Sequence, residues 1–136
     1  MDKQHGSSSL RVCEGILVQV AQGAWNLPMA EEYAAEAKQL IIEELPPQWV
    51  LLVDLRQWDY CPPEVWEYFN GVYEWYADHG MIAEGIVSTR KMINHFVTQL
   101  DKYRPIPCGQ FFSEDYEEVR QWCRDQLNSY KRSSNG

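Results

Sequence analysis

The side chains of this chain that could carry out catalysis or bind a metal are its cysteines and histidines, and their spacing matches no known kind of site. The four cysteines are widely separated, with no Cys-x-x-Cys pair among them: Cys13, Cys61, Cys108 and Cys123. The three histidines have no cysteine, histidine or acid at the spacing that zinc sites use: His5, His79 and His95. We therefore expect no metal centre and no cofactor.

Cys61 is the cysteine best placed to act as a nucleophile, because it precedes a predicted helix and a helix N-terminus lowers the pKa of a thiol. Pro62 and Pro63 follow it directly, however, and they remove two of the backbone N–H donors that would stabilise a thiolate. The paired glutamates elsewhere in the chain fit solvated helix faces and not an acid–base pair. The sequence thus predicts a protein with no catalytic residues, which is not an enzyme.

The composition is that of one acidic globular domain. With 136 residues, of which 45% are hydrophobic, the chain can bury a core of its own. Its net charge of −8 argues against nucleic acid or an anionic membrane surface as a partner. No apolar run approaches the roughly 20 residues of a membrane span. Residues 1–9 also lack an apolar signal core, so we expect a cytoplasmic protein with reduced cysteines.

Short apolar runs alternate with amphipathic stretches, a pattern typical of strands that alternate with helices. The predicted strands are 10–13, 16–20, 49–55, 81–87 and 108–112. The predicted helices are 29–45, 64–78, one from Ser88 or Thr89 to about 103, and one capped by Ser113 that ends near 130. We expect a single α/β domain over residues 10–130, in the order strand, strand, helix, strand, helix, strand, helix, strand, helix, with flexible tails at 1–9 and 131–136.

Three local signals support this order of elements. Glu14-Gly15 separates the first two strands and suits a tight hairpin turn. Asn26 is a good N-cap for the first helix, and Pro28 fits the start of that helix. Segment 49–55 (WVLLVDL) is almost entirely apolar, as expected of a central strand that is covered on both faces.

Residues 58–76 hold eight aromatic side chains, and the helix predicted at 64–78 has an unusually wide apolar face. The face covers an arc of about 180°, whereas a helix packed once on a sheet needs roughly 100°. Two readings remain open: contacts with neighbouring helices, or a surface for a partner or an apolar ligand. For the second reading, the candidate surface residues are Trp58, Tyr60, Glu64, Tyr68 and Trp75.

The opening hairpin, the strand exit Gly23-Ala24-Trp25-Asn26 and the strand end Val53-Asp54-Leu55 resemble those of the SpoIIAA-like, or STAS, domains. The resemblance covers about residues 10–130. It implies a right-handed β/α superhelix with a mixed five-stranded sheet and four helices, and a regulatory role without catalysis. In the phosphorylated anti-sigma antagonists of this family, a serine at the start of the helix after the third strand is the switch.

This chain departs from the family at that switch. The segment from Asp54 to Asn70, DLRQWDYCPPEVWEYFN, contains no serine or threonine. The positions where the family has Asp-Ser-Ser-Gly are occupied by Cys61, Pro62, Pro63 and Glu64. A serine phospho-switch therefore cannot operate here. Glu64 could supply a constant negative charge at the helix N-terminus, or it could be an ordinary acid of a first helical turn.

Two classes of function follow from the sequence. The first is a protein-interaction module that docks to a partner protein or to a second copy of itself as a homodimer. In a homodimer, Tyr68 and Trp75 would form an exposed pair on a twofold interface. The second is a carrier or sensor of a small apolar ligand, held near the aromatic helix.

Overall fold

The computed structural model describes residues 6–59, 61–102 and 108–135, which form five strands and four helices. The strands are β1 (Ser7–Cys13), β2 (Ile16–Gly23), β3 (Trp49–Trp58), β4 (Met81–Val87) and β5 (Gly109–Ser113). The helices are α1 (Leu27–Glu44), α2 (Pro63–Asp78), α3 (Arg90–Lys102) and α4 (Tyr116–Asn135). The predicted element order is confirmed. Within the described residues, none of these helices has the length and apolarity needed to cross a membrane.

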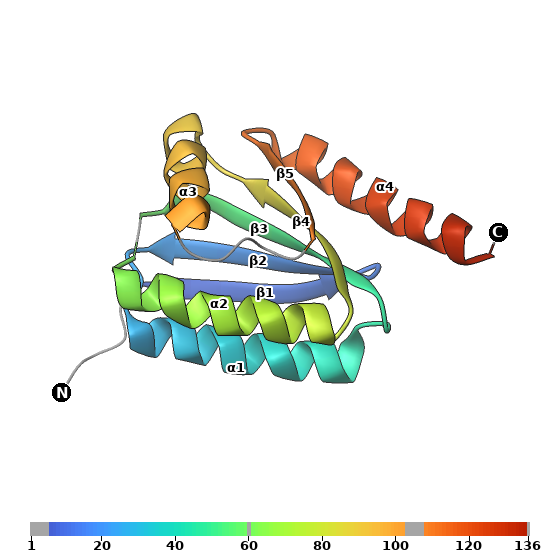
Figure 1. Ribbon diagram of the computed structural model, residues 1–136, viewed down its shortest axis with the longest axis horizontal. Helices are drawn as coiled ribbons and strands as arrows, with labels where there is room; N and C mark the ends of the chain where they lie inside the picture. Colours follow the sequence, from blue (N-terminus) through green and yellow to red (C-terminus); the bar gives the residue numbers. More distant parts are fainter. Residues whose placement is uncertain (1–5, 60, 103–107, 136) are drawn as a thin grey trace.

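The strands form one mixed sheet in the order β1-β2-β3-β4-β5 (Figure 1). β1 pairs with β2 in antiparallel fashion, and the remaining neighbours are parallel. Helices α1 and α2 lie side by side over one face of the sheet, and α4 packs on the other face against β3, β4 and β5. The sheet is therefore covered on both faces around its centre, which gives the domain two core clusters.

β3 is the central strand, as the apolar run predicts. Every side chain from Trp49 to Leu55 is buried, with odd-numbered residues in the α1–α2 cluster and Val50 and Leu52 in the α4 cluster. On the neighbouring strand, Gly85 allows α4 to approach the sheet closely. A Cβ atom at Gly85 would lie 2.6 Å from Val119 Cγ1, a distance that real Cβ atoms essentially never show.

The predicted β1–β2 turn and the predicted N-cap of α1 are both confirmed. Glu14 and Gly15 form the β1–β2 turn with φ values of 52° and 82°, the positive pair that a two-residue type I′ hairpin requires. The Asn26 side chain accepts a hydrogen bond from Met29 N at 3.2 Å and so caps α1. Thr89, one of the two candidates for its helix, caps α3 by accepting a bond from Met92 N.

The cap predicted for α4 is wrong. Ser113 still belongs to β5, where it pairs with Val87, so its backbone is extended two residues before the cap position. Asp115 caps α4 instead, because its Oδ1 accepts hydrogen bonds from Glu117 N at 2.9 Å and Glu118 N at 3.3 Å. Ser113 Oγ supports the turn by accepting a bond from Asp115 N.

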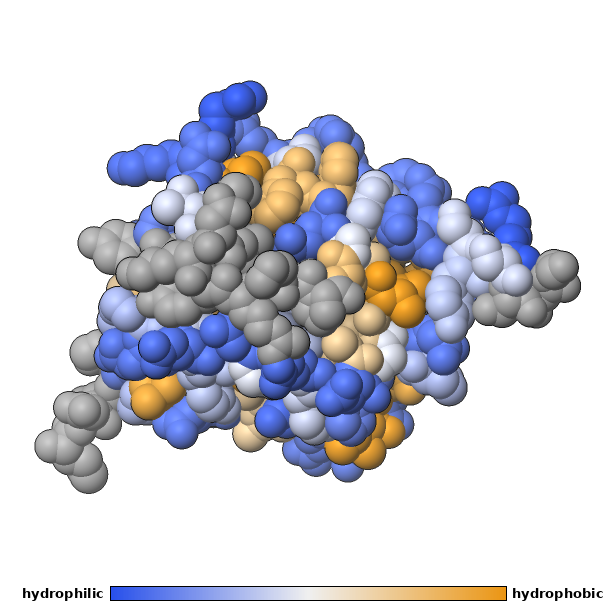
Figure 2. All heavy atoms as spheres, in the orientation of Figure 1, coloured by the Kyte–Doolittle hydropathy of each residue, from blue (hydrophilic) through white to orange (hydrophobic). Residues whose placement is uncertain are grey.

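The ordered elements extend into both predicted tails. β1 begins at Ser7, and α4 runs to Asn135, five residues past the expected end near 130. Ser7–Ser9 are ordered because β1 pairs with β2 along its whole length. The face seen in Figure 2 is mostly hydrophilic with separate hydrophobic spots. Among the described residues, the large exposed apolar side chains are Ile42 and Tyr130.

Candidate functional site

The edge of the sheet where the parallel strands end is the first place to look for a functional site. Strands β2 to β5 run parallel, so their carboxyl ends meet at one edge, and ligands of open α/β sheets bind outside such ends. β3 continues to Trp58, three residues beyond the predicted end at Leu55. The Asp59 backbone N–H donates to Gly23 O at 3.1 Å, which ties the exit of β3 to the end of β2.

Asp54 and Arg56 form a tight ion pair near this edge. Arg56 donates from Nε to Asp54 Oδ1 at 2.9 Å and from Nη2 to Oδ2 at 2.7 Å, a bidentate geometry. The Asp54 side chain is buried, while that of Arg56 is 48% exposed and lies over the Tyr116 ring. Arg11 in turn donates to the Tyr116 hydroxyl. These contacts fix a positively charged side chain at the surface.

Exposed residues continue from this pair to the first turn of α2, and we call them the docking edge: Arg56, Gln57, Asp59, Pro62, Pro63 and Glu64. Pro62 is the N-cap of α2 and provides no side-chain cap, while Val65 N donates to Pro62 O at 3.0 Å. Glu64 is the acidic residue of the first turn. The segment thus exposes the charges of Arg56, Asp59 and Glu64, and two prolines restrict its backbone before α2.

Cys61 lies beside the docking edge and is not a reactive thiol. Its side chain is 4% exposed. Burial, with a smaller contribution from the charge of Glu64, raises the pKa of Cys61 to about 12. Nucleophilic attack requires the thiolate, a form that the raised pKa of Cys61 disfavours near neutral pH. Among the described residues, no group of histidine, cysteine and acidic side chains could hold a metal ion.

The structure places the five predicted surface residues in different environments. Trp58 is a core residue and not a surface residue: it is 6% exposed, with its ring edge-on to Trp25 and Trp66. Trp58 is even-numbered but faces the α1–α2 cluster, because β3 has one extra residue relative to β2 between the pairs Val20–Asp54 and Gln22–Gln57, and this irregularity reverses the alternation of the strand. Tyr60 lies outside the described residues. Of the remaining three, Glu64 is exposed, whereas Tyr68 and Trp75 are half-buried.

Tyr68 and Trp75 face α1 and are not the fully exposed pair that the dimer prediction requires. The Trp75 ring stacks on His79 at 3.7 Å between ring centroids, and Lys38 of α1 lies over it at 5.3 Å. Burial and the charge of Glu31 on α1 raise the pKa of Tyr68. The wide apolar face of α2 is therefore largely explained by its packing beside α1. Self-association and an apolar ligand near α2 stay predictions.

Sequence reasoning missed the most unusual polar residue, Glu84 of β4. Its side chain has no exposed surface and lies on the α1–α2 side of the sheet. Tyr73 of α2 donates to Glu84 Oε2, and Gln110 of β5 donates to Oε1 at 2.8 Å. The signal for it was present: an acid in the middle of the otherwise apolar strand MIAEGIV.

The surroundings of Glu84 favour its neutral form. Burial raises the pKa of Glu84 to about 7, although the hydrogen bonds from Tyr73 and Gln110 lower it. Burial, followed by the charge of Glu84, raises the pKa of Tyr73 well above 10 and that of Cys108 to about 12. A hydrogen bond between the hydroxyls of Tyr33 and Tyr76 lies in the same cluster. Within this cluster, Glu84 is the group whose pKa is raised to about 7.

No family of known sequences matches the chain, and no curated protein matches it in sequence. Solved structures do match it in fold. An uncharacterized protein of the DUF3478 family with a SpoIIAA-like fold, from Shewanella loihica PV-4, is 13% identical with a TM-score of 0.65. That match covers 90% of this chain and 97% of the Shewanella chain.

Two anti-sigma factor antagonists are similar as well. The antagonist from Mycobacterium paratuberculosis is 14% identical with a TM-score of 0.55, over 88% of this chain and 94% of its own. The unphosphorylated form of the antagonist SpoIIAA is 13% identical with a TM-score of 0.56, over 82% and 92% of the two chains. With the strand order and the helix positions given above, these likenesses show that the chain has the SpoIIAA-like fold.

Proposed function

We propose that this chain is a non-enzymatic, STAS-like regulatory domain that docks to a protein partner through the docking edge. The fold shared with two anti-sigma factor antagonists supports a regulatory role. The burial and the raised pKa of Cys61 support a function that does not use this thiol. The observation that carries the proposal is the docking edge itself, because it combines exposed opposite charges with a restrained backbone at the end of the parallel strands.

The proposed docking does not depend on serine phosphorylation. From Asp54 to Asn70 there is no hydroxyl of serine or threonine to modify. Glu64 provides a permanent negative charge at the N-terminus of α2, where the helix dipole stabilises it. The partner would therefore meet the same charge pattern at all times, and regulation would come from the supply of the partner.

The experiment that tests the proposal begins with a photo-crosslinking amino acid at Gln57, on the docking edge. The matched control carries it at Gln121, an exposed residue of α4. Mass spectrometry identifies the protein that each position captures in cells, and a second copy of this chain would be recognised in the same way. We expect one protein to be captured from Gln57 and not from Gln121.

Affinity measurements with that purified protein then test the charges. Glu64→Lys and Asp59→Lys should each weaken binding by about tenfold, or ~1.4 kcal/mol. The control Glu43→Lys makes the same charge change at an exposed position near the end of α1 and should alter binding less than about twofold. Equal effects of all three substitutions, or specific capture from Gln121 alone, would refute docking at this edge.

A further inference from the structure

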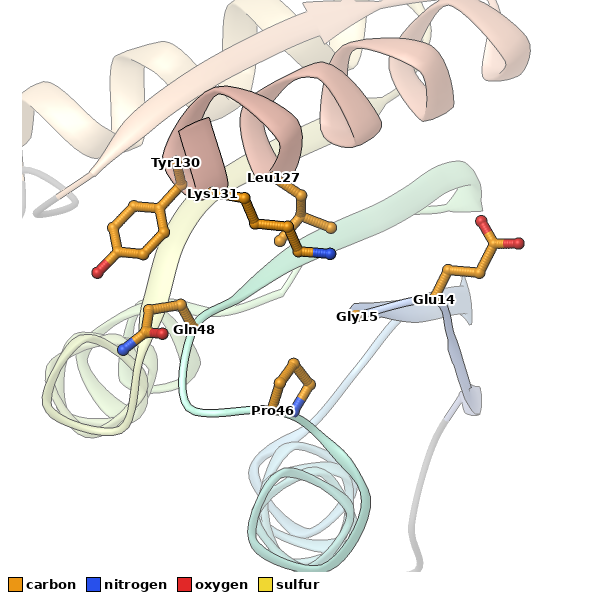
Figure 3. A pocket seen from close by; sticks show the side chains of 7 residues that line it. All are labelled: Glu14, Gly15, Pro46, Gln48, Leu127, Tyr130 and Lys131. Atoms are coloured by element: carbon orange, nitrogen blue, oxygen red, sulfur yellow. The ribbon is translucent and has the colours of Figure 1, made fainter. Parts of the chain in front are cut away.

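A second candidate site lies at the opposite end of the parallel strands from the docking edge. A cavity of about 360 Å³ opens between the C-terminal part of α4 and the loops that lead into β2 and β3 (Figure 3). Its lining comes from three separate segments: Glu14 and Gly15, Pro46 and Gln48, and Leu127, Tyr130 and Lys131. We call it the α4 pocket. Its volume falls within the range of small-molecule sites in proteins.

The β1–β2 turn forms one side of the α4 pocket and is held in place by a backbone hydrogen bond. Gly15 O accepts a hydrogen bond from Val50 N at 3.2 Å, which ties the turn to β3. A Cβ atom at Gly15 would lie in ordinary van der Waals contact with Leu127 Cδ1, at 3.4 Å, so the turn and the C-terminal part of α4 lie close together at the pocket. Glu14 has a φ of 52° and is the single non-glycine residue with positive φ among those described. Such outliers persist where the surrounding structure holds them.

The charges of the α4 pocket favour an anion. Glu14, the acid of the lining, forms an ion pair of 3.5 Å with Arg124. Lys131, by contrast, forms no ion pair with any acid in the described part of the chain. Figure 3 shows the Lys131 side chain reaching beneath α4 toward the turn, with Tyr130 and Gln48 on the far side of the cavity. Lys131 thus places at this pocket a positive charge that no acid among the described residues pairs with, in a chain whose net charge is −8.

The remaining lining is suited to an apolar body. Leu127 is buried at the back of the site, Pro46 lies opposite it, and Tyr130 is 39% exposed although it is a large aromatic residue. A planar or aliphatic group could cover the Tyr130 ring and bury apolar area that now faces water. Gln48 adds an amide that can donate a hydrogen bond.

We propose that the α4 pocket binds a small organic anion, a carboxylate on an aromatic or short aliphatic body. The carboxylate pairs with Lys131 Nζ, and the body packs against Tyr130, Leu127 and Pro46. This site is separate from the docking edge, so its occupancy does not depend on the proposed partner.

Benzoate is the probe that tests this site, with benzamide as its neutral counterpart of the same shape. Both are titrated into the full chain at constant ionic strength, and the backbone amide resonances of Gly15, Gln48 and Lys131 are followed by NMR. We expect benzoate to shift these three resonances with a saturating curve and a Kd of roughly millimolar order. Benzamide should bind at least about tenfold more weakly, because it offers no charge to Lys131.

Two substitutions and one control test the charge of the α4 pocket separately from its apolar lining. Lys131→Gln should abolish the preference for benzoate, whereas Arg132→Gln removes a neighbouring exposed charge of α4 and should preserve it. Tyr130→Ala should weaken benzoate and benzamide by the same factor. All three positions are exposed, so the fold is expected to tolerate each change.

Three results would overturn the proposal. The first is the absence of saturable shifts at the pocket with benzoate. The second is equal affinity of the wild-type chain for benzoate and benzamide. The third is equal loss of the preference in Lys131→Gln and Arg132→Gln, which would mean that general electrostatics and not this pocket attracts the anion.

Discussion

Tyr73 on α2 donates a hydrogen bond to Glu84 on β4, whose carboxyl group is sealed inside the core beside a central strand. Gln110 of β5 holds the other oxygen of the same carboxyl group. One buried acid thus joins a covering helix to a strand at the edge of the sheet. Among the described residues, the hydrogen bonds from Tyr73 and Gln110 oppose the effect of burial on the pKa of Glu84.

We predict that the stability of this protein falls as the pH rises through neutrality because of Glu84. Its pKa is raised from 4.5 to about 7 in the folded protein, so the folded state binds this proton more tightly than the unfolded state. The contribution is complete below about pH 4.5 and is lost as the pH rises through about 7. Urea unfolding of the wild-type chain and Glu84→Gln between pH 4 and 8 measures it. Relative to Glu84→Gln, the wild-type chain should lose roughly 1–3 kcal/mol across this range.

Tyr73→Phe provides an internal check on the same group. Without the Tyr73 hydroxyl, the carboxylate form of Glu84 loses a hydrogen bond, so the pKa of Glu84 should rise further. The fall in stability should then continue to a higher pH than in the wild-type chain. A stability difference between the wild-type chain and Glu84→Gln that does not change with pH would contradict both expectations.

A second prediction concerns the central strand. Leu52→Ala should lower the free energy of unfolding by about 2–5 kcal/mol, because Leu52 is fully buried between β3 and α4. Ile42→Ala is the matched control, since Ile42 is 68% exposed on α1 and should cost less than about 0.5 kcal/mol. Chemical denaturation measures both, and a loss below about 1 kcal/mol for Leu52→Ala would be inconsistent with a covered central strand.

A third prediction concerns Trp75. Because its ring stacks on His79 and has Lys38 over it, Trp75→Ala should lower the free energy of unfolding by roughly 1–3 kcal/mol. The oligomeric state of the Trp75→Ala variant, measured by analytical ultracentrifugation, should equal that of the wild-type chain. If the wild-type chain is a dimer and Trp75→Ala is a monomer of unchanged stability, Trp75 belongs to a self-association surface and this prediction is wrong.

A fourth prediction concerns thiol reactivity. Cys61 and Cys123 are buried with pKa values of about 12, so both should react slowly with a thiol reagent at pH 7.5 in the folded protein. Cys13 is half-buried and should be modified before them. Peptide mass spectrometry over a time course gives the order. If Cys61 is modified as fast in the folded protein as in urea, its thiol is accessible, and Cys61 would again be a candidate catalytic nucleophile.

Much of the fold could be predicted because the signals that specify it are local. The apolar run 49–55 predicts a central strand since a strand buried on both faces needs no polar alternation. The side-chain oxygen of Asn26 and the Glu14-Gly15 turn act within three residues of their own position. Ser113 was a misleading signal, because it pairs with Val87 on another strand and this pairing moves the cap to Asp115.

The candidate sites depended on contacts between distant segments, which periodicity does not report. The aromatic face of α2 is equally consistent with a partner and with a neighbouring helix, and only the position of α1 placed Trp75 beside Lys38. The sequence shows Glu84 as an acid within an apolar strand, but only the tertiary structure shows the hydrogen bonds that it accepts from Tyr73 and Gln110. Likewise Lys131 becomes part of a pocket because the end of α4 lies above Gly15 and Pro46. The sequence determined the elements through local backbone and side-chain preferences, whereas tertiary packing decided which side chains are shielded from water and what charge surrounds them.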